Sequence, residues 1–224
     1  MHPFVEALQC YVNPYRNKEK AEQMTRYMKD NFPFLGIQSP ERKQLLRTFL
    51  QQYGKPQKED LFEITRHLWS LPEREFQNIA LDLFEKNLKH LDDTFLPLFE
   101  EMITTKSWWD TIDYIASRLI GFVFTSYPHH IEVYIPKWMA SNNIWLQRTA
   151  ILFQLKYKER TNTALLFSII EELSDSKEFF IQKAIGWALR EYAKTDAQTV
   201  LHFVNSHTLA PLSKREALKH IQTT

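Results

Sequence analysis

Apolar side chains recur at helical spacing along the whole chain. In segment 41–52 they fall on one face with a period near 3.6 residues, at Leu45, Leu46, Phe49 and Leu50. The same period returns in segment 76–84, at Phe76, Ile79, Ala80, Leu83 and Phe84, and in segment 181–189, at Ile181, Ala184, Ile185, Ala188 and Leu189. We therefore predict about a dozen helices of roughly 10 to 18 residues, joined by short turns.

Polar residues add helix-start signals, and the turn signals of strand-rich folds are scarce. Four stretches have capping-box spacing, beginning at Asp60, Ser107, Asp175 and Ser213, and Ser39-Pro40 has the pattern of an N-cap followed by proline. The chain holds only 4 glycines and no Asn-Gly or Asp-Gly pair, which are the usual signals of tight hairpins. These features predict an all-α fold.

A 35-residue repeat relates the predicted helices to one another. Segments 76–80, 146–150 and 181–185 align, and the equivalent position of successive repeats carries Lys43, Asn78, Asp113, Arg148 and Lys183. Such a period is typical of helix-pair arrays of the HEAT type, in which equivalent positions line up along one surface. We predict a single domain over residues 1–224, a HEAT-like helical repeat solenoid (α-α superhelix) in which residues 1–38 form an N-terminal helical cap.

The repeat predicts a cluster of aromatic and charged side chains on one concave face. Trp109 lies one helical turn before Asp113, and Trp187 lies one turn after Lys183, so each pair shares a helix face. Arg148 occupies the repeat between these two pairs. We expect the helices that carry positions 78, 113, 148 and 183 to be parallel neighbours that line this face.

Three further residues extend the predicted cluster. Arg190 lies one turn beyond Trp187 and lengthens the basic edge. Tyr27 and Gln38, in the N-terminal cap, are expected to close the other side.

A simpler interpretation of the same residues stays open. Asp113 and Arg148 can form an ion pair that only links two repeats, because a helical carboxylate is usually solvated or paired. A tryptophan on a helix is often a core residue, so Trp109 suits packing as well as a site. The other indoles suit the core better, because their surroundings are apolar and they lack the relation to the repeat: Trp69, Trp108, Trp138 and Trp145.

Composition narrows the setting of the protein. Its 224 residues carry a net charge of +1, and from residue 140 onward 11 Lys and Arg against 8 Asp and Glu give a local net of +3. A single cysteine, no secretory signal and no apolar run of about 20 residues predict a cytoplasmic protein. The eight histidines show no metal-ligand spacing, His129-His130 follows a proline in an expected loop, and no phosphate loop or nucleophile elbow occurs. We expect neither a metal nor another cofactor.

Five stretches resemble the AlkD-type DNA alkylation-repair glycosylases. They are segments 34–38 (FLGIQ), 106–113 (KSWWDTID), 143–148 (NIWLQR), 179–187 (FFIQKAIGW) and 209–217 (LAPLSKREA). The likeness covers essentially the whole chain. It shows no departure at the residues that the family uses in its site, Trp109, Asp113, Arg148 and Trp187.

The resemblance implies an activity and its partners. The expected enzyme is a monomer that binds duplex DNA in its concave face and acts on bacterial chromosomal DNA. It is expected to need no metal and to bind no membrane. It would excise positively charged N3- and N7-alkylated purines, such as 3-methyladenine and 7-methylguanine, without flipping the base. The expected site residues are Asp113, Trp109 and Trp187 for catalysis, and Arg148, Lys183, Arg190, Tyr27 and Gln38 for DNA binding.

The chemistry of the lesion suits these residue types. A purine alkylated at N3 or N7 is positively charged and already a good leaving group, and its departure leaves an oxocarbenium-like sugar. A carboxylate stabilises that cation and positions water, while an indole face attracts a cation by about 0.5–2 kcal/mol. Two rival hypotheses are a HEAT-repeat module that binds DNA or protein without catalysis and a purely structural interaction protein. Aspartate at position 113, rather than asparagine or alanine, favours the enzyme.

Overall fold

The protein is described by a computed structural model that covers residues 2–221, and every regular element in this range is helical. Fourteen α-helices occur in the described residues, so the all-α prediction is confirmed. None of them is long and apolar enough to cross a membrane. The chain divides into two compact units, one ending at Leu91 and one beginning at Asp92. The prediction of one domain over residues 1–224 stays a prediction.

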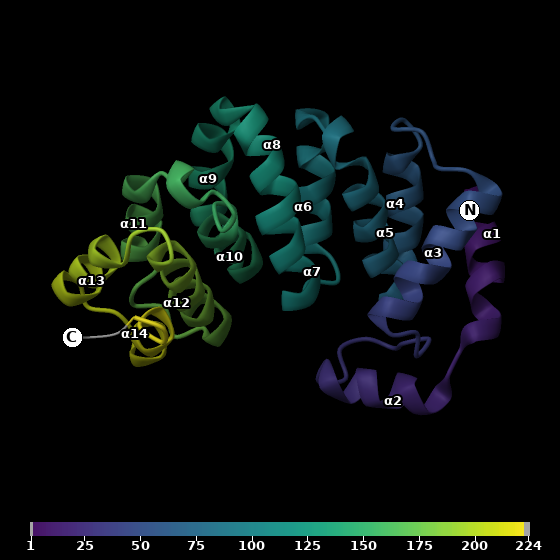
Figure 1. The fold of residues 1–224 in the computed structure, drawn as a ribbon, viewed down its shortest axis with the longest axis horizontal. Helices are drawn as coiled ribbons and strands as arrows, with labels where there is room; N and C mark the ends of the chain where they lie inside the picture. Colours follow the sequence, from purple (N-terminus) through teal and green to yellow (C-terminus); the bar gives the residue numbers. More distant parts are fainter. Residues whose placement is uncertain (1, 222–224) are drawn as a thin grey trace. The chain divides into compact units, whose positions relative to one another are not determined.

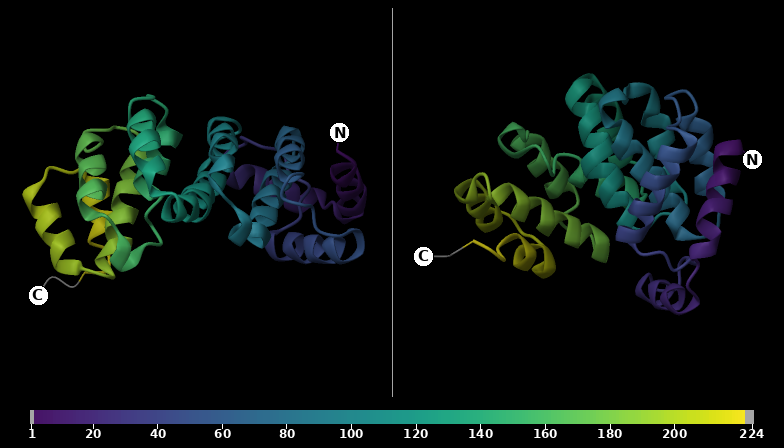
Figure 2. Two further views of the ribbon diagram at one scale, coloured as in Figure 1. Left: turned by 90° about the horizontal axis from the view of Figure 1, so that it is seen from above. Right: turned by 45° about the vertical axis from the view of Figure 1, so that its right-hand side comes forward.

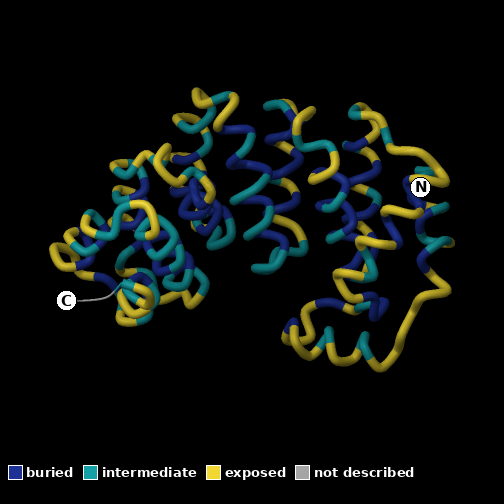
Figure 3. The backbone as a smooth tube through the Cα atoms, in the orientation of Figure 1, coloured by how far each residue is buried: buried dark blue, intermediate teal, exposed yellow. Residues whose placement is uncertain are grey.

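The first unit packs its helices around a core of aliphatic and phenylalanine side chains. Its helices are α1 (Pro3–Val12), α2 (Lys18–Tyr27), α3 (Ser39–Tyr53), α4 (Leu61–Ser70) and α5 (Arg74–Asn87), shown in Figure 1. α3 packs against α5, α4 packs against α5, and α1 packs against α3 and α4. The apolar faces predicted for segments 41–52 and 76–84 are buried (Figure 3). α1 buries three residues, whereas α2 buries none.

A buried carboxylate fixes the segment that joins α2 to α3. Glu75, in the first turn of α5, accepts hydrogen bonds from the backbone N–H groups of residues 35–37 at 2.9, 2.9 and 3.1 Å. Gly36 has a φ of +87°, and a Cβ there would lie 2.0 Å from the carbonyl oxygen of Asn17, so this position requires glycine. Burial raises the pKa of Glu75, and the backbone hydrogen bonds oppose that rise. The segment around Gly36 is therefore held by structural contacts.

The second unit continues as a succession of helix pairs. Its helices are α6 (Leu96–Thr104), α7 (Trp109–Tyr114), α8 (Gly121–Ser126), α9 (Ile131–Met139), α10 (Ile144–Leu152), α11 (Thr163–Glu172), α12 (Phe179–Ala193), α13 (Ala197–Ser206) and α14 (Pro211–Ala217). Short turns η3 (Asp93–Phe95), η5 (Pro128–His130) and η6 (Lys158–Arg160) connect some of them. α10 packs against α6, α7, α9, α11 and α12, and α12 packs against α13 and α14. Figure 2 shows the helices in two further views.

α7 and α8 are the two ends of one continuous helix. The π-helical segment η4 (Ile115–Ile120) joins them without a break in the helical backbone. Ser117 Oγ donates a hydrogen bond to the carbonyl oxygen of Asp113 at 2.7 Å, where α7 gives way to η4. Single π-helical turns within α-helices are rare and are frequent at functional sites.

The 35-residue spacing corresponds to the second helix of successive pairs. Asn78 lies in α5, Asp113 in α7, Arg148 in α10 and Lys183 in α12. Because α10 contacts both α7 and α12, the predicted neighbour relation is confirmed within the second unit. Lys43 and Asn78 belong to the first unit, so their alignment with the other three positions stays a prediction.

At the four predicted capping boxes, the described structure has no side-chain bond from the N-cap residue. The N-cap positions of α4, α7, α12 and α14 are Asp60, Trp108, Glu178 and Ala210, and none of these makes a side-chain capping bond. The hydroxyls of Ser107 and Ser213 donate instead to the carbonyl oxygens of Ile103 and Gln182. α3 begins at Ser39 itself, one residue earlier than predicted. Side-chain caps of α-helices are made by His2, Asn17, Asn143, Asn162 and Asp196.

Candidate active site

A cavity of 280 Å³ in the second unit collects most of the predicted site residues. It is lined by Trp109, Asp113, Arg148, Phe179, Phe180, Lys183, Trp187, Arg190 and Glu216, from α7, α10, α12 and α14. Tyr27 on α2 and Gln38 at the N-cap of α3 are exposed in the first unit, and their part in the site stays a prediction. The repeat spacing thus brings together all the predicted site residues of the second unit.

A bidentate ion pair forms part of the lining of the candidate site. Arg148 Nε donates to Asp113 Oδ1 at 2.7 Å, and Arg148 Nη2 donates to Asp113 Oδ2 at 3.0 Å. Arg148 Nη1 also donates to the carbonyl oxygen of Phe180. The Arg148 side chain is only 5% exposed and that of Asp113 is 18% exposed. The guanidinium therefore holds the carboxylate in one orientation. Only the Arg148 N–H groups that do not bond Asp113 or Phe180 are available for the predicted phosphate contact.

Two opposing effects set the protonation of Asp113. Burial raises the pKa of this carboxyl, and the nearby Asp110 raises it further. The hydrogen bonds and the positive charge of Arg148 lower the pKa, so they favour the charged form. Asp113 is therefore a carboxylate that is partly shielded from water and is held there by one partner, Arg148.

Adjacent tryptophans at the start of α7 have different surroundings. Trp108 packs with Trp145 and Phe180, with ring centroids 5.8 and 5.1 Å away, and Trp145 lies 4.9 Å from Phe180. Trp109 lines the cavity one turn before Asp113. Trp108 and Trp145 are half-buried in this aromatic cluster, whereas Trp69 and Trp138 are buried, as predicted for core residues.

The basic edge of the cavity contains a second carboxylate that the sequence pattern did not single out. Glu216 Oε1 lies 3.0 Å from Lys183 Nζ, and Glu216 Oε2 lies 2.6 Å from Arg190 Nη1. Hydrogen bonds and charge from Lys183 and Arg190 hold the pKa of Glu216 at about 2. Three cations and two carboxylates line the cavity, a net charge of 3 − 2 = +1.

A close contact between α12 and α14 brings Glu216 to the site. Gly186 lies in α12, and a Cβ there would be 2.4 Å from Glu216 Cβ and 2.9 Å from the carbonyl oxygen of Ser213. Ser213 is buried, and its Oγ donates to the carbonyl oxygen of Gln182 at 3.0 Å. Both residues of the supposed capping box Ser213-x-x-Glu216 therefore face α12. The signal in the sequence was their place in segment 209–217, which resembles the glycosylases.

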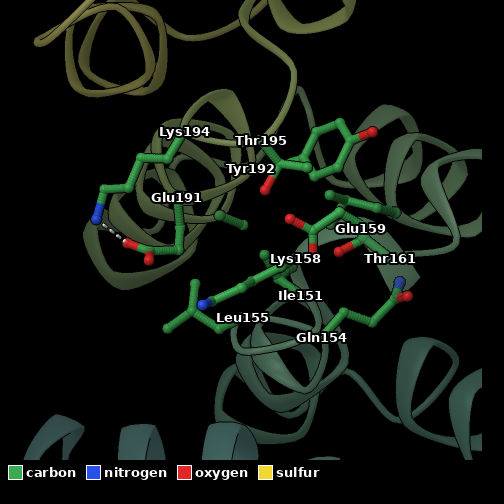
Figure 4. Close-up of a pocket in the computed structure, with 12 residues that line it drawn as sticks. Ile151, Gln154, Leu155, Lys158, Glu159, Thr161, Glu191, Tyr192, Lys194 and Thr195 are labelled. Carbon is green, nitrogen blue, oxygen red and sulfur yellow. Dashed lines mark hydrogen bonds and ion pairs between the residues drawn. The ribbon is translucent and has the colours of Figure 1, made fainter.

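A second hollow, of 310 Å³, has a different character (Figure 4). Its charged lining residues are Lys158, Glu159, Glu191 and Lys194, and Lys194 Nζ lies 2.6 Å from Glu191 Oε2. Two cations and two carboxylates balance one another, and none of the four is buried. This hollow therefore lacks a fixed, partly dehydrated charge of the kind found at Asp113.

The fold and the site together define a class of protein. The chain is a helical-repeat protein whose equivalent repeat positions supply a carboxylate paired with a buried guanidinium to a cavity lined with indoles and cations. Residues 9–221 match the family of DNA alkylation repair enzymes, and the chain belongs to that family. Its role is therefore in the repair of alkylated DNA.

A solved structure and the curated proteins extend this comparison. The chain resembles a protein described as a predicted DNA alkylation repair enzyme from Enterococcus faecalis, with a TM-score of 0.86 and 33% sequence identity. The match covers 93% of this chain and 98% of the other. No curated protein matches the sequence.

Proposed function

We propose that the protein is a DNA glycosylase that hydrolyses the N-glycosidic bond of positively charged N3- and N7-alkylated purines, such as 3-methyladenine and 7-methylguanine, in duplex DNA. The observation that carries this proposal is Asp113, a carboxylate oriented by two hydrogen bonds from Arg148 at a cavity that Trp109 and Trp187 also line. Membership of the family of DNA alkylation repair enzymes supports it.

The reaction needs a stabilised cation and a water molecule. The bond from the sugar C1′ to the purine nitrogen breaks, and its electron pair leaves with the base, which becomes neutral. Positive charge then develops on the sugar, where the Asp113 carboxylate stabilises it. Each Asp113 oxygen accepts one bond from Arg148, so further acceptor positions are left for the attacking water. Water oxygen bonds to C1′, and its proton passes to the carboxylate or to solvent.

Arg148 acts on the reaction through Asp113. Its guanidinium is fixed by Asp113 and by the Phe180 carbonyl, so the carboxylate does not need to reorient as charge develops. Preorganised charges of this kind are effective because no reorganisation is required at the moment of reaction. The guanidinium also opposes the effect of burial on the Asp113 pKa and favours the ionised form.

The lining of the cavity supports a reaction on a stacked, unflipped base. A pocket for a flipped base reads its hydrogen-bonding edge and encloses the ring. The cavity of about 280 Å³ is only as large as the smallest small-molecule sites, which span about 300–1,000 Å³. Its lining residues include no Asn or Gln side chain that would pair with a purine edge. We assign Trp109 and Trp187 to the deoxyribose of the lesion, whose developing charge their indole faces attract.

Lys183 and Arg190 are the groups best placed to meet the DNA backbone. Their side chains are 37% and 21% exposed, and each binds a different oxygen of Glu216. Phosphate contacts by such residues release counterions, so the logarithm of the affinity should fall linearly with the logarithm of the salt concentration. We expect a monomer to bind duplex DNA in this way, with Arg148, Tyr27 and Gln38 as additional contacts.

The test is release of free base from a defined lesion. The protein is incubated with a duplex that contains one 7-methylguanine, and the free base and the abasic strand are measured against a matched undamaged duplex. Glycosylase activity releases 7-methylguanine and leaves the undamaged duplex intact. Binding without release would instead favour a non-catalytic HEAT-repeat module, in which the Asp113–Arg148 pair only links two repeats.

A further inference from the structure

We propose that Asp93, His129 and His130 form a binding site for a divalent transition-metal ion, with Zn²⁺ as the best match, at a place separate from the candidate active site. One ligand atom from each of these three residues lies within 4.8 Å of the other two. The residues come from η3 and η5, in the second unit. The expectation of a metal-independent glycosylase is unaffected, because none of the three lines the catalytic cavity.

The ligand atoms need only small side-chain movements to converge. His130 Nε2 already lies 2.8 Å from Asp93 Oδ2. The rings of His129 and His130 have centroids 4.2 Å apart and planes inclined by 39°. Four ligands at 2.0–2.1 Å around a tetrahedral Zn²⁺ are about 3.3 Å apart. His129 is exposed, so its ring can rotate toward this spacing without disturbing the core.

The surroundings of the three residues favour a cation. Tyr134 on α9 lies against His130, with ring centroids 5.8 Å apart. Lys137 Nζ lies 2.6 Å from Glu100 Oε1 and is therefore paired with Glu100. The charge of Asp93 faces His130 on η5 instead.

Two imidazoles and one carboxylate select a class of metal. Imidazole nitrogen suits Zn²⁺, Ni²⁺ and Cu²⁺, whereas Mg²⁺ and Ca²⁺ prefer oxygen ligands. Three protein ligands leave a fourth position for water. The ion would link the turn that begins α6 to the turn that begins α9. Spacing along the chain does not reveal the site, because Asp93 and His130 are 37 residues apart.

The test measures Zn²⁺ affinity calorimetrically in untagged protein. A Cys10→Ser background removes the exposed thiol, which could also bind zinc. In that background we compare the parent with His129→Ala and Asp93→Asn. The matched control is His207→Ala, which removes a histidine whose Nε2 lies 3.0 Å from Glu171, outside the three-residue group.

The expected result is one Zn²⁺ per chain, an affinity at least about tenfold weaker in His129→Ala and Asp93→Asn, and an unchanged affinity in His207→Ala. Zn²⁺ should raise the melting temperature of the parent and of His207→Ala, but not that of His129→Ala. Equal Zn²⁺ affinity in the parent and His129→Ala would mean that Asp93 and His130 form an ion pair only, and would overturn the site. Equally tight Mg²⁺ binding would overturn the assigned class of metal.

Discussion

Two carboxylates with raised pKa values, one fully buried in the first unit and one partly buried in the second, have different roles. Glu75 is 1% exposed and accepts three backbone N–H bonds, from residues 35–37. Asp113 accepts its two protein N–H bonds from Arg148, and its side chain is 18% exposed at a cavity. Burial raises the pKa of both groups. Burial and a raised pKa therefore do not identify a catalytic carboxylate.

The two carboxylates differ in their hydrogen-bond donors and in whether they face a cavity. Backbone N–H groups bind Glu75 on both oxygens, so its charge is used to hold a loop. A side-chain guanidinium binds Asp113 from one direction and leaves acceptor positions at a cavity that also presents indoles. A charge with unused acceptor positions beside a cavity is available to a substrate. The contacts of Glu75 are structural, and those of Asp113 support the catalytic role that we propose for it.

The largest expected effect is on the chemistry of Asp113. Asp113→Asn keeps the size of the side chain and one acceptor for Arg148 but removes the negative charge. We expect single-turnover excision of 7-methylguanine to slow by about 10²–10³-fold, because the developing cation loses its counter-charge. DNA affinity should change little, since removal of an acid also relieves repulsion from phosphate. A slowing of less than about tenfold, which corresponds to 1.4 kcal/mol at the barrier, would count against the catalytic role.

The second effect falls on the stability of the first unit. Glu75→Gln replaces one acceptor oxygen by an NH₂ group that faces backbone N–H donors. We expect the free energy of unfolding to fall by about 1–3 kcal/mol, because buried donors lose their partner. Urea titration followed by circular dichroism measures this loss. If Glu75→Gln unfolded at the wild-type midpoint, the structural assignment of Glu75 would be wrong.

A third prediction concerns the contact that brings Glu216 to the site. Gly186→Ala adds a methyl group 2.4 Å from Glu216 Cβ and 2.9 Å from the Ser213 carbonyl, so α14 must shift. Overpacking of this kind costs about 1–3 kcal/mol, which thermal melting should register. The control is Gly54→Ala, where no atom lies within 4 Å of the added Cβ, although its φ of +85° carries a cost of its own. A lower DNA affinity in Gly186→Ala, but not in Gly54→Ala, would show that this packing also positions Arg190 for DNA binding.

The smallest expected effect is the pH dependence contributed by Glu216. Its pKa is lowered from 4.5 to about 2 by Lys183 and Arg190. A carboxyl with a lowered folded-state pKa contributes stability that is present above its unfolded pKa and is lost as pH falls toward the folded value. Urea midpoints of the wild type should therefore decline from about pH 4.5 toward pH 2 more steeply than those of Glu216→Gln. Parallel profiles would show that this ion triad does not contribute to folding.

Glu75 and Asp113 differ from Glu216 in the sign of this linkage. Burial raises their folded-state pKa values, so their protonation on acidification relieves a penalty and does not remove stability. For Asp113 the same shift predicts that excision is lost on the acid side, because the ionised form is required. The acid limb of the pH–rate profile should lie above the ordinary Asp pKa of 3.8, after subtraction of uncatalysed depurination.

Local periodicity predicted the helices, and long-range repetition predicted the site of the second unit. The faces at Leu45 and Phe49 are buried as expected because apolar spacing alone decides which side of a helix leaves water. The 35-residue spacing placed Asp113 opposite Arg148 because equivalent positions of neighbouring repeats meet. The metal independence, lesion range and monomeric state of the protein stay predictions.

Contacts between elements that the 35-residue repeat does not relate could not be predicted from the sequence. No sequence pattern pointed to the contacts of Glu75, because its donors lie 38 to 40 residues earlier in a loop. Ser213-x-x-Glu216 had capping-box spacing, yet packing of α14 on Gly186 drew both side chains to α12. Local patterns state what a side chain can do, and tertiary neighbours decide which of those bonds it makes.

The central claim is that the charge of Asp113 acts on the reaction, whereas the charge of Glu75 acts on the fold. The most direct measurement is single-turnover release of 7-methylguanine by the wild type, Asp113→Asn and Glu75→Gln, each at a temperature where its melting curve shows it folded. The account predicts excision reduced by about 10²–10³-fold in Asp113→Asn. It predicts a near-wild-type rate with a lowered melting temperature in Glu75→Gln. Wild-type excision by folded Asp113→Asn, with only a lowered melting temperature, would contradict it.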